Sequence, residues 1–203
     1  MTIKALIFDV GSVLVRMVDE TPRLQLAERY NLPLIDVYHA IFDSPTAFPA
    51  CVGQLTIEQH WEAVFTELPI PAPEKEAFIR QFWAADGLNT ELVEAIRTLR
   101  QNYKLGLLSN AWSDLRANLT HRWQIADLFE VLIISAEVGL AKPDPAIYQL
   151  ALERLAVAPQ EAVFIDDVLE NIESAQSVGL LTVHYQDNLQ LFAELQELLQ
   201  PPS

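Results

Sequence analysis

The sequence is poor in cysteine, in glycine and in long apolar runs. Its 203 residues include one cysteine, Cys51, which has no partner for an internal disulfide, so we expect a buried structural thiol in a reducing compartment. Only 6 glycines are present, which excludes a glycine-rich linker or a low-complexity protein. No apolar run approaches the roughly 18 residues of a membrane-spanning helix, and the N-terminal run reaches Asp9 too soon for a signal peptide. These absences predict a cytoplasmic protein with no membrane partner.

Basic residues are also scarce. The 13 Lys and Arg residues face 28 Asp and Glu residues, so the net charge is −15. Such a surface repels the phosphates of nucleic acids and anionic membranes, and we expect neither as a partner. An anionic substrate therefore needs a local positive site. Hydrophobic residues make up 51% of the chain, enough for a sizeable core, which excludes disorder.

Five short apolar runs predict strands, and helical patterns lie between them. Because the runs are continuous rather than alternating, we expect strands buried on both faces, as in a parallel sheet. Strands alternating with helices predict an α/β fold with a Rossmann-like, doubly wound parallel sheet. The predicted strands are residues 3–8, 104–108, 131–134, 162–165 and 181–185, and the helices between them are residues 91–102, 145–156 and 171–178.

Residues 17–86 do not follow this alternation. They contain four helical patterns, at residues 21–30, 34–42, 56–68 and 73–83, with no convincing strand among them. We therefore predict two domains. Residues 1–16 and 87–203 form the Rossmann-like core, which holds the catalytic residues, and residues 17–86 form a small helical domain inserted after the first strand.

Polar residues follow three of the apolar runs, at the point where each predicted strand ends. In an open parallel sheet, ligands bind beyond the carboxyl ends of the strands. Taken singly, such residues are typical of turns, helix caps or solvated charges. Together they bring carboxylates, a hydroxyl and an ammonium to one edge of the sheet. They are, in chain order, Asp9, Ser109 and Asn110, Lys142 in the loop before a predicted helix, and Asp166 and Asp167.

This set of residues suits phosphate chemistry. Neighbouring carboxylates repel each other unless a cation is present, and Mg²⁺ commonly binds one or two carboxylates together with substrate phosphate. A carboxylate also serves as a nucleophile toward phosphorus and forms an aspartyl-phosphate. Lys142 and the hydroxyl of Ser109 are suited to hold the phosphoryl oxygens. A helix expected to start near Trp112 would add backbone N–H groups.

Four segments of the chain, in this order, resemble the four motifs of the haloacid dehalogenase superfamily. They are Phe8-Asp9-Val10-Gly11-Ser12-Val13, Leu108-Ser109-Asn110, Lys142-Pro143 and Phe164-Ile165-Asp166-Asp167. The resemblance covers nearly the whole chain, and the inserted helices correspond to the family's cap. It implies that Asp9 is the nucleophile. The implied phosphoryl-binding residues are Ser109, Asn110 and the catalytic Lys142, and the implied Mg²⁺ ligands are Asp9, the backbone carbonyl of Gly11, Asp166 and, assisting them, Asp167.

Gly11 departs from the superfamily's phosphatase pattern, Asp-x-Asp-Gly-Thr/Val. The second Asp of that pattern is the general acid/base, and Gly11 stands in its place. Glycine keeps the backbone carbonyl but has no proton to give. General acid/base catalysis typically contributes ~10²–10⁴ in rate, so the loss matters. Water, a cap residue such as His39 or His60, or a leaving group that needs little protonation would have to compensate.

A subgroup of the superfamily with Asp-x-Gly-x-Val in its first motif looks similar to this chain, and its members hydrolyse sugar phosphates, including glucose 1-phosphate. The prediction is therefore a Mg²⁺-dependent phosphatase that hydrolyses a small phosphomonoester, with a sugar phosphate as one candidate, through an aspartyl-phosphate. Its partner would be a phosphorylated small molecule, and the protein would be a monomer or a homodimer.

Two alternatives stay open. A 2-haloacid dehalogenase also lacks the second Asp, but it works without metal and usually has Ser where Asp166 stands. A non-catalytic binding protein on the same scaffold would have little reason to keep all the polar residues of the four motifs. For substrate choice, the candidate cap residues are Phe48, Trp61 and the two histidines. Closure of the cap would use hinges near residues 15–19 and 84–89, the second of which contains the turn signal Asp86-Gly87.

Overall fold

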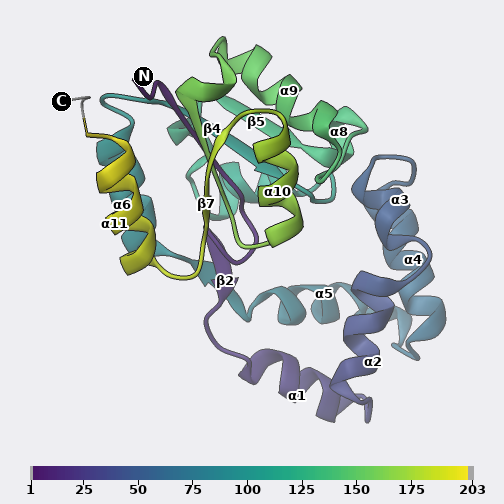
Figure 1. Ribbon diagram of the computed structural model, residues 1–203. Helices are drawn as coiled ribbons and strands as arrows, with labels where there is room; N and C mark the ends of the chain where they lie inside the picture. Colours follow the sequence, from purple (N-terminus) through teal and green to yellow (C-terminus); the bar gives the residue numbers. More distant parts are fainter. Residues whose placement is uncertain (1, 201–203) are drawn as a thin grey trace.

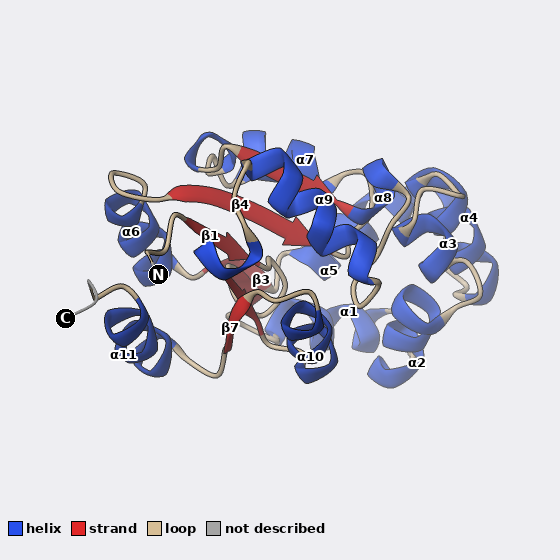
Figure 2. Cartoon of the chain, turned by 45° about the horizontal axis from the view of Figure 1, so that its top comes forward, coloured by secondary structure: helices blue, strands red, loops and turns tan. Residues whose placement is uncertain are grey.

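The computed structural model describes residues 2–200, and its centre is a five-stranded parallel sheet (Figures 1 and 2). All four strand pairs are parallel, and the strand order is β5-β4-β1-β6-β7. The predicted doubly wound α/β fold is confirmed, with strand ends that differ from the expected ones by a residue or two. The strands are β1 (Ala5–Phe8), β4 (Lys104–Ser109), β5 (Val131–Ile134), β6 (Ala162–Asp166) and β7 (Leu181–His184).

Helices cover both faces of this sheet, as Figure 1 shows. One face packs against α6 (Thr90–Leu99) and α11 (Asn188–Leu198), and the other against α9 (Pro145–Leu155) and α10 (Leu169–Ser177). Shorter elements connect them: α7 (Leu115–Ala117), η3 (Asn118–Arg122), η4 (Ala126–Leu128), α8 (Ser135–Val138) and η5 (Pro159–Glu161). No helix in residues 2–200 is long and apolar enough to span a membrane.

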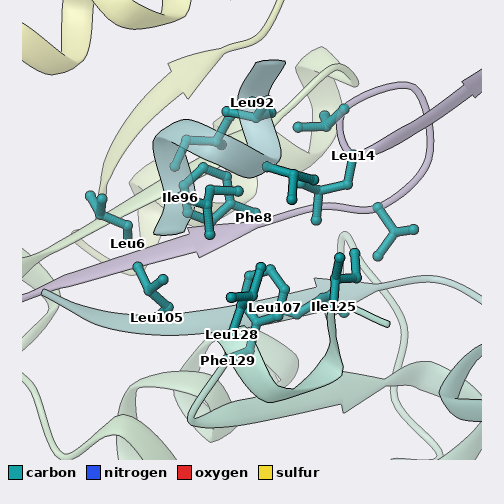
Figure 3. Packing of buried hydrophobic residues seen from close by; sticks show 14 of the residues in the cluster. Leu6, Phe8, Leu14, Leu92, Ile96, Leu105, Leu107, Ile125, Leu128 and Phe129 are labelled. Carbon is teal, nitrogen blue, oxygen red and sulfur yellow. The ribbon is translucent and has the colours of Figure 1, made fainter. Parts of the chain in front are cut away.

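The side chains of β1 alternate between the two faces and so hold this strand at the centre of the sheet. Leu6 and Phe8 point to the face of α6, where they gather with Leu92 and Ile96 (Figure 3). Ala5 and Ile7 belong to the cluster on the opposite face. Full burial of one such large side chain contributes roughly 1.5–3 kcal/mol. This packing therefore fixes the position of the carboxyl end of β1, and with it the position of Asp9, the next residue.

A helical segment lies between β2 (Val15–Met17) and β3 (Asp86–Leu88) and has a hydrophobic cluster of its own, which includes Leu26, Ile41 and Phe82. The four predicted helices are confirmed, although residues 34–42 divide into an α-helix and a π-helix, and α3 was not expected. The domain boundaries themselves stay a prediction. The elements are α1 (Thr21–Arg29), α2 (Leu34–Tyr38), η1 (His39–Asp43), α3 (Ala47–Cys51), α4 (Ile57–Glu67), η2 (Ala72–Glu74) and α5 (Lys75–Trp83).

The two ends of the helical segment pair with each other. β2 and β3 form an antiparallel ladder, and the backbone N–H groups of Val18 and Asp19 donate to the carbonyl of Ala85. The expectation of no strand in residues 17–86 is thus wrong at both edges, and Asp86-Gly87 is part of a strand rather than a turn. Strands of three residues are too short to show a period in the sequence. Movement about residues 15–19 and 84–89 stays a prediction, and the ladder would couple the two hinges.

Candidate active site

The carboxyl ends of three adjacent strands bring the predicted site residues together. Asp9 directly follows β1, while Ser109 ends β4 and Asp166 ends β6, and β1 lies between these two strands. The N–H of Asp9 donates to the carbonyl of Ile165, so the ladder between β1 and β6 continues into the site. Asp9, Ser109 and Asp166 are all buried. The sheet topology therefore sets the positions of these three side chains.

Lys142 joins two of the carboxylates. Its Nζ lies 2.8 Å from Oδ1 of Asp9 and 2.6 Å from Oδ2 of Asp166, and its side chain is buried. Asn110 holds the backbone of Lys142 from both sides: its amide donates to the carbonyl of Lys142, and its Oδ1 accepts from the N–H of Lys142, both at 2.7 Å. Asn110 was expected to bind substrate. In the structure its side chain positions Lys142.

Asn171 is a site residue that the sequence did not reveal. Its Nδ2 donates to both carboxylate oxygens of Asp166, at 3.0 and 3.1 Å, and the N–H of Val168 donates to Oδ1 at 2.8 Å. Asn171 is buried in the first turns of α10, five residues after Asp166. That spacing is the only signal in the sequence that could have pointed to it. Together with Lys142, these donors hold the Asp166 side chain in one orientation.

The charges of the site are out of balance. Burial raises the pKa of Asp9 to about 6; the Lys142 ammonium opposes this rise and the Asp166 charge adds to it. Burial alone would lower the pKa of Lys142, but the attraction of Asp9 and Asp166 outweighs it and raises that pKa. The ammonium is thus firmly charged. One ammonium faces three carboxylates, since Asp167 also belongs to the cluster, and this leaves an excess of negative charge.

The donor set fits a divalent cation. Asp9, Asp166 and Asp167 each offer a carboxylate oxygen, and these oxygens lie within 4.8 Å of one another. Hard oxygen donors with excess negative charge are the ligands that Mg²⁺ prefers. The carbonyl of Gly11 accepts a hydrogen bond from the N–H of Val13 at 2.7 Å, and a carbonyl oxygen has a second lone pair for another contact. The residues present therefore suit Mg²⁺.

We expect Mg²⁺ to stabilise the folded protein. Binding to the native state at about 100 times the Kd adds ~2.7 kcal/mol, which for a chain of this size raises Tm by about 5–10 °C. The measurement is Tm against MgCl₂ concentration, with NaCl of equal ionic strength as the control. The variant Asp167→Asn should reduce the shift. An equal rise of Tm in NaCl would contradict a specific metal site at these carboxylates.

The segment after β4 differs from the expected one. The helix predicted to start near Trp112 begins at Leu115 instead, and its three α-helical residues continue directly into the π-helix η3. Trp112 lies in the loop before it and contacts the helical segment. Its Nε1 donates to the carbonyl of Ala47 at 3.2 Å, and its ring stacks on Phe42 at 5.9 Å. The tryptophan thus links the core to the inserted helices.

A cavity of about 1020 Å³ lies between the end of the sheet and the inserted helices. Gly11, Ser109 and Asn110 line it on the core side, and Phe48 and Trp83 line it on the helical side. The neighbours of Asp9 rather than Asp9 itself form its wall, since Asp9 and Lys142 are buried. The cavity therefore reaches residues next to the cluster of carboxylates.

The cap residues named as candidates are distributed differently. His60 is fully buried, its Nδ1 lies 2.8 Å from Thr46 Oγ1, and burial lowers its pKa, so it is a core histidine. His39 is exposed beside Asp43, and Trp61 belongs to the cluster of the inserted helices. Of the candidates, only Phe48 lines the cavity in the part of the chain that the structure describes.

Cys51 is not the buried thiol that was expected. It is partly exposed and lines the cavity, and its Sγ lies 3.2 Å from Oγ of Ser135. Burial still raises the pKa of the thiol, which keeps it protonated. Ser135 Oγ also donates to the carbonyl of Cys51 at 2.6 Å. Cys51 therefore contributes to the contact between the inserted helices and the core.

The fold and the site define a hydrolase of one family. The model of the haloacid dehalogenase-like hydrolase family matches residues 3–179, so the chain belongs to this family. Among solved structures, it resembles a family enzyme from Bacteroides thetaiotaomicron in complex with magnesium and inorganic phosphate, with a TM-score of 0.77, 22% identity, and coverage of 94% of this chain and 99% of that one. It also resembles a 2-haloacid dehalogenase from Pseudomonas syringae, with a TM-score of 0.64, 19% identity, and coverage of 97% and 99%.

Curated relatives include phosphatases. The chain is 28% identical to bifunctional epoxide hydrolase 2 of Sus scrofa, of which it spans 41% while the match covers 100% of this chain. It is 26% identical to a sesquiterpene phosphatase of Aspergillus oryzae, with 98% of this chain and 97% of that protein covered. It is 27% identical to a phosphorylated carbohydrates phosphatase of Thermotoga maritima, with 89% and 84% covered. The protein is thus a hydrolase with phosphatases among its relatives.

Proposed function

We propose that the protein is a Mg²⁺-dependent phosphatase that hydrolyses a small phosphomonoester through an aspartyl-phosphate. The observation that carries the proposal is the Lys142 ammonium held between Asp9 and Asp166, with Asp167 in the same cluster, next to a large cavity. The relatives from Aspergillus oryzae and Thermotoga maritima are both named as phosphatases but differ in what they dephosphorylate. These names support phosphate-ester hydrolysis as the reaction class. They do not indicate which alcohol is the leaving group.

Asp9 is the proposed nucleophile. Its ionised carboxylate attacks phosphorus, the bond from phosphorus to the ester oxygen breaks, and an acyl-phosphate forms on the aspartate. The departing ester oxygen takes a proton from water and leaves as the alcohol. Lys142 and the hydroxyl of Ser109 hold the phosphoryl oxygens. Asn110 positions the backbone of Lys142, and Asn171 positions the side chain of Asp166. Water then cleaves the acyl-phosphate and regenerates Asp9. Mg²⁺ bound by the carboxylates would neutralise the charge that builds up on the phosphoryl group.

A screen of phosphate and halide release tests the reaction class. We expect inorganic phosphate from phosphomonoesters in the presence of Mg²⁺, and loss of release when EDTA removes the metal. Halide release from 2-haloacids that ignores EDTA would instead identify a dehalogenase. Binding of phosphate without turnover of any ester would identify a non-catalytic protein. Location in the cytoplasm, absence of nucleic acid partners and a monomeric or dimeric state stay predictions.

Lys142→Ala should lower kcat/KM for phosphate release by about 10²–10³, the scale for losing one preorganised electrostatic contact. The variant also leaves two buried carboxylates without their ammonium, so its rate is measured at saturating Mg²⁺ and below its own Tm. Lys4→Ala removes a lysine from an exposed ion pair with Glu161 and is the matched control. An unchanged rate in Lys142→Ala would place this lysine outside the chemistry.

A further inference from the structure

Within residues 2–200, five aromatic side chains line the cavity. Phe42 stacks on Trp112 with a centroid distance of 5.9 Å and an interplanar angle of 10°. Trp83 contacts both rings edge-on, at 6.0 Å from Phe42 and 6.1 Å from Trp112. Phe48 and Trp123 line the same cavity. The rings come from the inserted helices and from the core, so closure of the two parts over each other builds the aromatic wall.

Three of the polar side chains on the wall are engaged with other parts of the protein. Arg23 pairs with Asp86 at 2.6 Å, and Asn118 donates to Asp114 at 3.3 Å. Arg122 donates to the backbone carbonyl of Trp83 at 2.8 Å. Selective binding of a sugar needs side chains that are free to bond its hydroxyl groups. Arg23, Asn118 and Arg122 are less available for this role because each already has a partner in the protein.

Two of the aromatic side chains on the cavity wall are exposed to solvent, which is unfavourable for apolar groups. Phe48 is 63% exposed and Phe42 is 42% exposed, and both are on the cavity wall. Exposed apolar groups gathered in one place mark a surface that something covers. The cavity of about 1020 Å³ is at the upper end of the ~300–1,000 Å³ typical of sites for drug-sized ligands. The cavity therefore has room for an apolar group larger than a single ring.

Gly11 adds a constraint from chemistry. Gly11 lines the cavity beside Asp9 but has no side chain to donate a proton, and the carboxyl groups of Asp86 and Asp114 on the cavity wall are bonded to Arg23 and Asn118. A leaving group that departs without a proton is thus favoured. A phenol, like the tyrosine side chain, has a pKa near 10, far below that of about 16 for water, so a phenolate leaves much more readily than an alkoxide.

We propose that the substrate is the phosphate monoester of an aromatic alcohol with two or more fused or linked rings, which stack against the wall formed by Phe42, Phe48, Trp83 and Trp112. This inference rests on the proposed phosphatase function and specifies its leaving group. The carboxylate of Asp9 forms a bond to phosphorus, the bond from phosphorus to the aryl oxygen breaks, and the aryloxide leaves and takes a proton from water. Hydrolysis of the acyl-phosphate by water releases inorganic phosphate, so that the ester and one water give the phenol and phosphate.

Three substrates separate ring size from leaving-group chemistry. Phenyl phosphate has one ring, 2-naphthyl phosphate has two, and 2-(2-naphthyl)ethyl phosphate has the same two rings on an alkyl leaving group. We expect KM for 2-naphthyl phosphate to be at least about tenfold lower than for phenyl phosphate, since a second ring buries four more carbons. We expect kcat for the naphthylethyl ester to be at least about tenfold lower than for the naphthyl ester. Glucose 1-phosphate should have the highest KM of the set.

Phe48→Ala tests the wall directly. Phe48 is exposed, so its loss should leave the fold intact, and KM for 2-naphthyl phosphate should rise about fivefold or more while KM for acetyl phosphate, which has no ring, stays the same. Ile35→Ala is the control: it removes an exposed apolar side chain, 56% exposed, from α2 without touching the cavity wall. Neither KM should change in this control.

The outcomes distinguish this inference from the proposed function. Hydrolysis of acetyl phosphate or phenyl phosphate without any gain from a second ring overturns the aromatic leaving group and leaves the phosphatase standing. A lower KM for glucose 1-phosphate than for 2-naphthyl phosphate does the same. No phosphate release from any of these esters, nor from acetyl phosphate, at saturating Mg²⁺ overturns the proposed function, and the inference fails with it.

Discussion

Asp9→Asn is expected to lower phosphate release by about 10⁴-fold or more, the scale for removing a catalytic nucleophile. The amide matches the carboxylate in shape but does not form the acyl-phosphate, and it contributes no charge to a bound cation. The fold should survive, because the backbone of Asp9 stays bonded to Ile165 and the buried carboxylate is itself disfavoured, as its pKa of about 6 indicates. The measurement is kcat for phosphate release at saturating Mg²⁺, together with Tm.

Asp43→Asn is the matched control for Asp9→Asn. Asp43 is exposed, and its carboxylate lies 3.8 Å from Nε2 of His39, so the same chemical change there should alter neither kcat nor Tm. Activity of a folded Asp9→Asn protein close to that of the wild type would refute Asp9 as the nucleophile. Loss of activity with a collapse of Tm would be explained by unfolding, and for that reason the two readouts are taken on the same sample.

Gly11→Asp should raise the rate for esters of primary alcohols by about 10²-fold, the lower end of what a general acid typically contributes. Aryl phosphates have good leaving groups and should gain little. A glycine often marks a position where a side chain would clash or where the backbone is left-handed, and neither applies at Gly11. A first side-chain carbon at Gly11 would meet no other heavy atom within 4 Å, and its φ lies outside the left-handed region. The new carboxylate therefore has room.

Repulsion opposes the gain in Gly11→Asp. A further carboxylate joins the cluster of Asp9, Asp166 and Asp167, so the measurement is made at saturating Mg²⁺. The quantity compared is kcat/KM for an alkyl and an aryl phosphate in both proteins, and a rise in the alkyl-to-aryl ratio supports the missing acid. A folded, Mg²⁺-binding variant with an unchanged ratio would mean that another group already supplies the proton.

If Gly11→Asp leaves the alkyl-to-aryl ratio unchanged, the structure indicates which other groups to test as the proton donor. His60 is buried in the inserted helices and His39 is exposed beside Asp43, so neither histidine faces the cavity. Asp86 and Asp114 do line it, and burial raises the pKa of both carboxyl groups. Asp114→Asn in the wild-type background would then be the next variant to measure with the alkyl ester.

Much of the site was predictable because local patterns mark strand ends. Asp9, Ser109 and Asp166 follow or end continuous apolar runs, and parallel strands bring such ends to one edge of a sheet. The role of Asn110 was not predictable in detail. Its side chain forms two hydrogen bonds with the backbone of Lys142, but in the sequence it cannot be distinguished from any other polar residue that follows a strand. Asn171 was missed for the same reason, since its contact with Asp166 depends on how α10 docks.

Hydrophobic periodicity and local residue types were enough to predict the α/β fold, the inserted helices and the order of the polar residues along the chain. What surrounds these residues depends on tertiary contacts. The loop after β4 carries Trp112 against Phe42 and Trp83, and this contact across long sequence distances builds the cavity. Which cap residues face that cavity depends on the packing of separate helices, which no local pattern encodes.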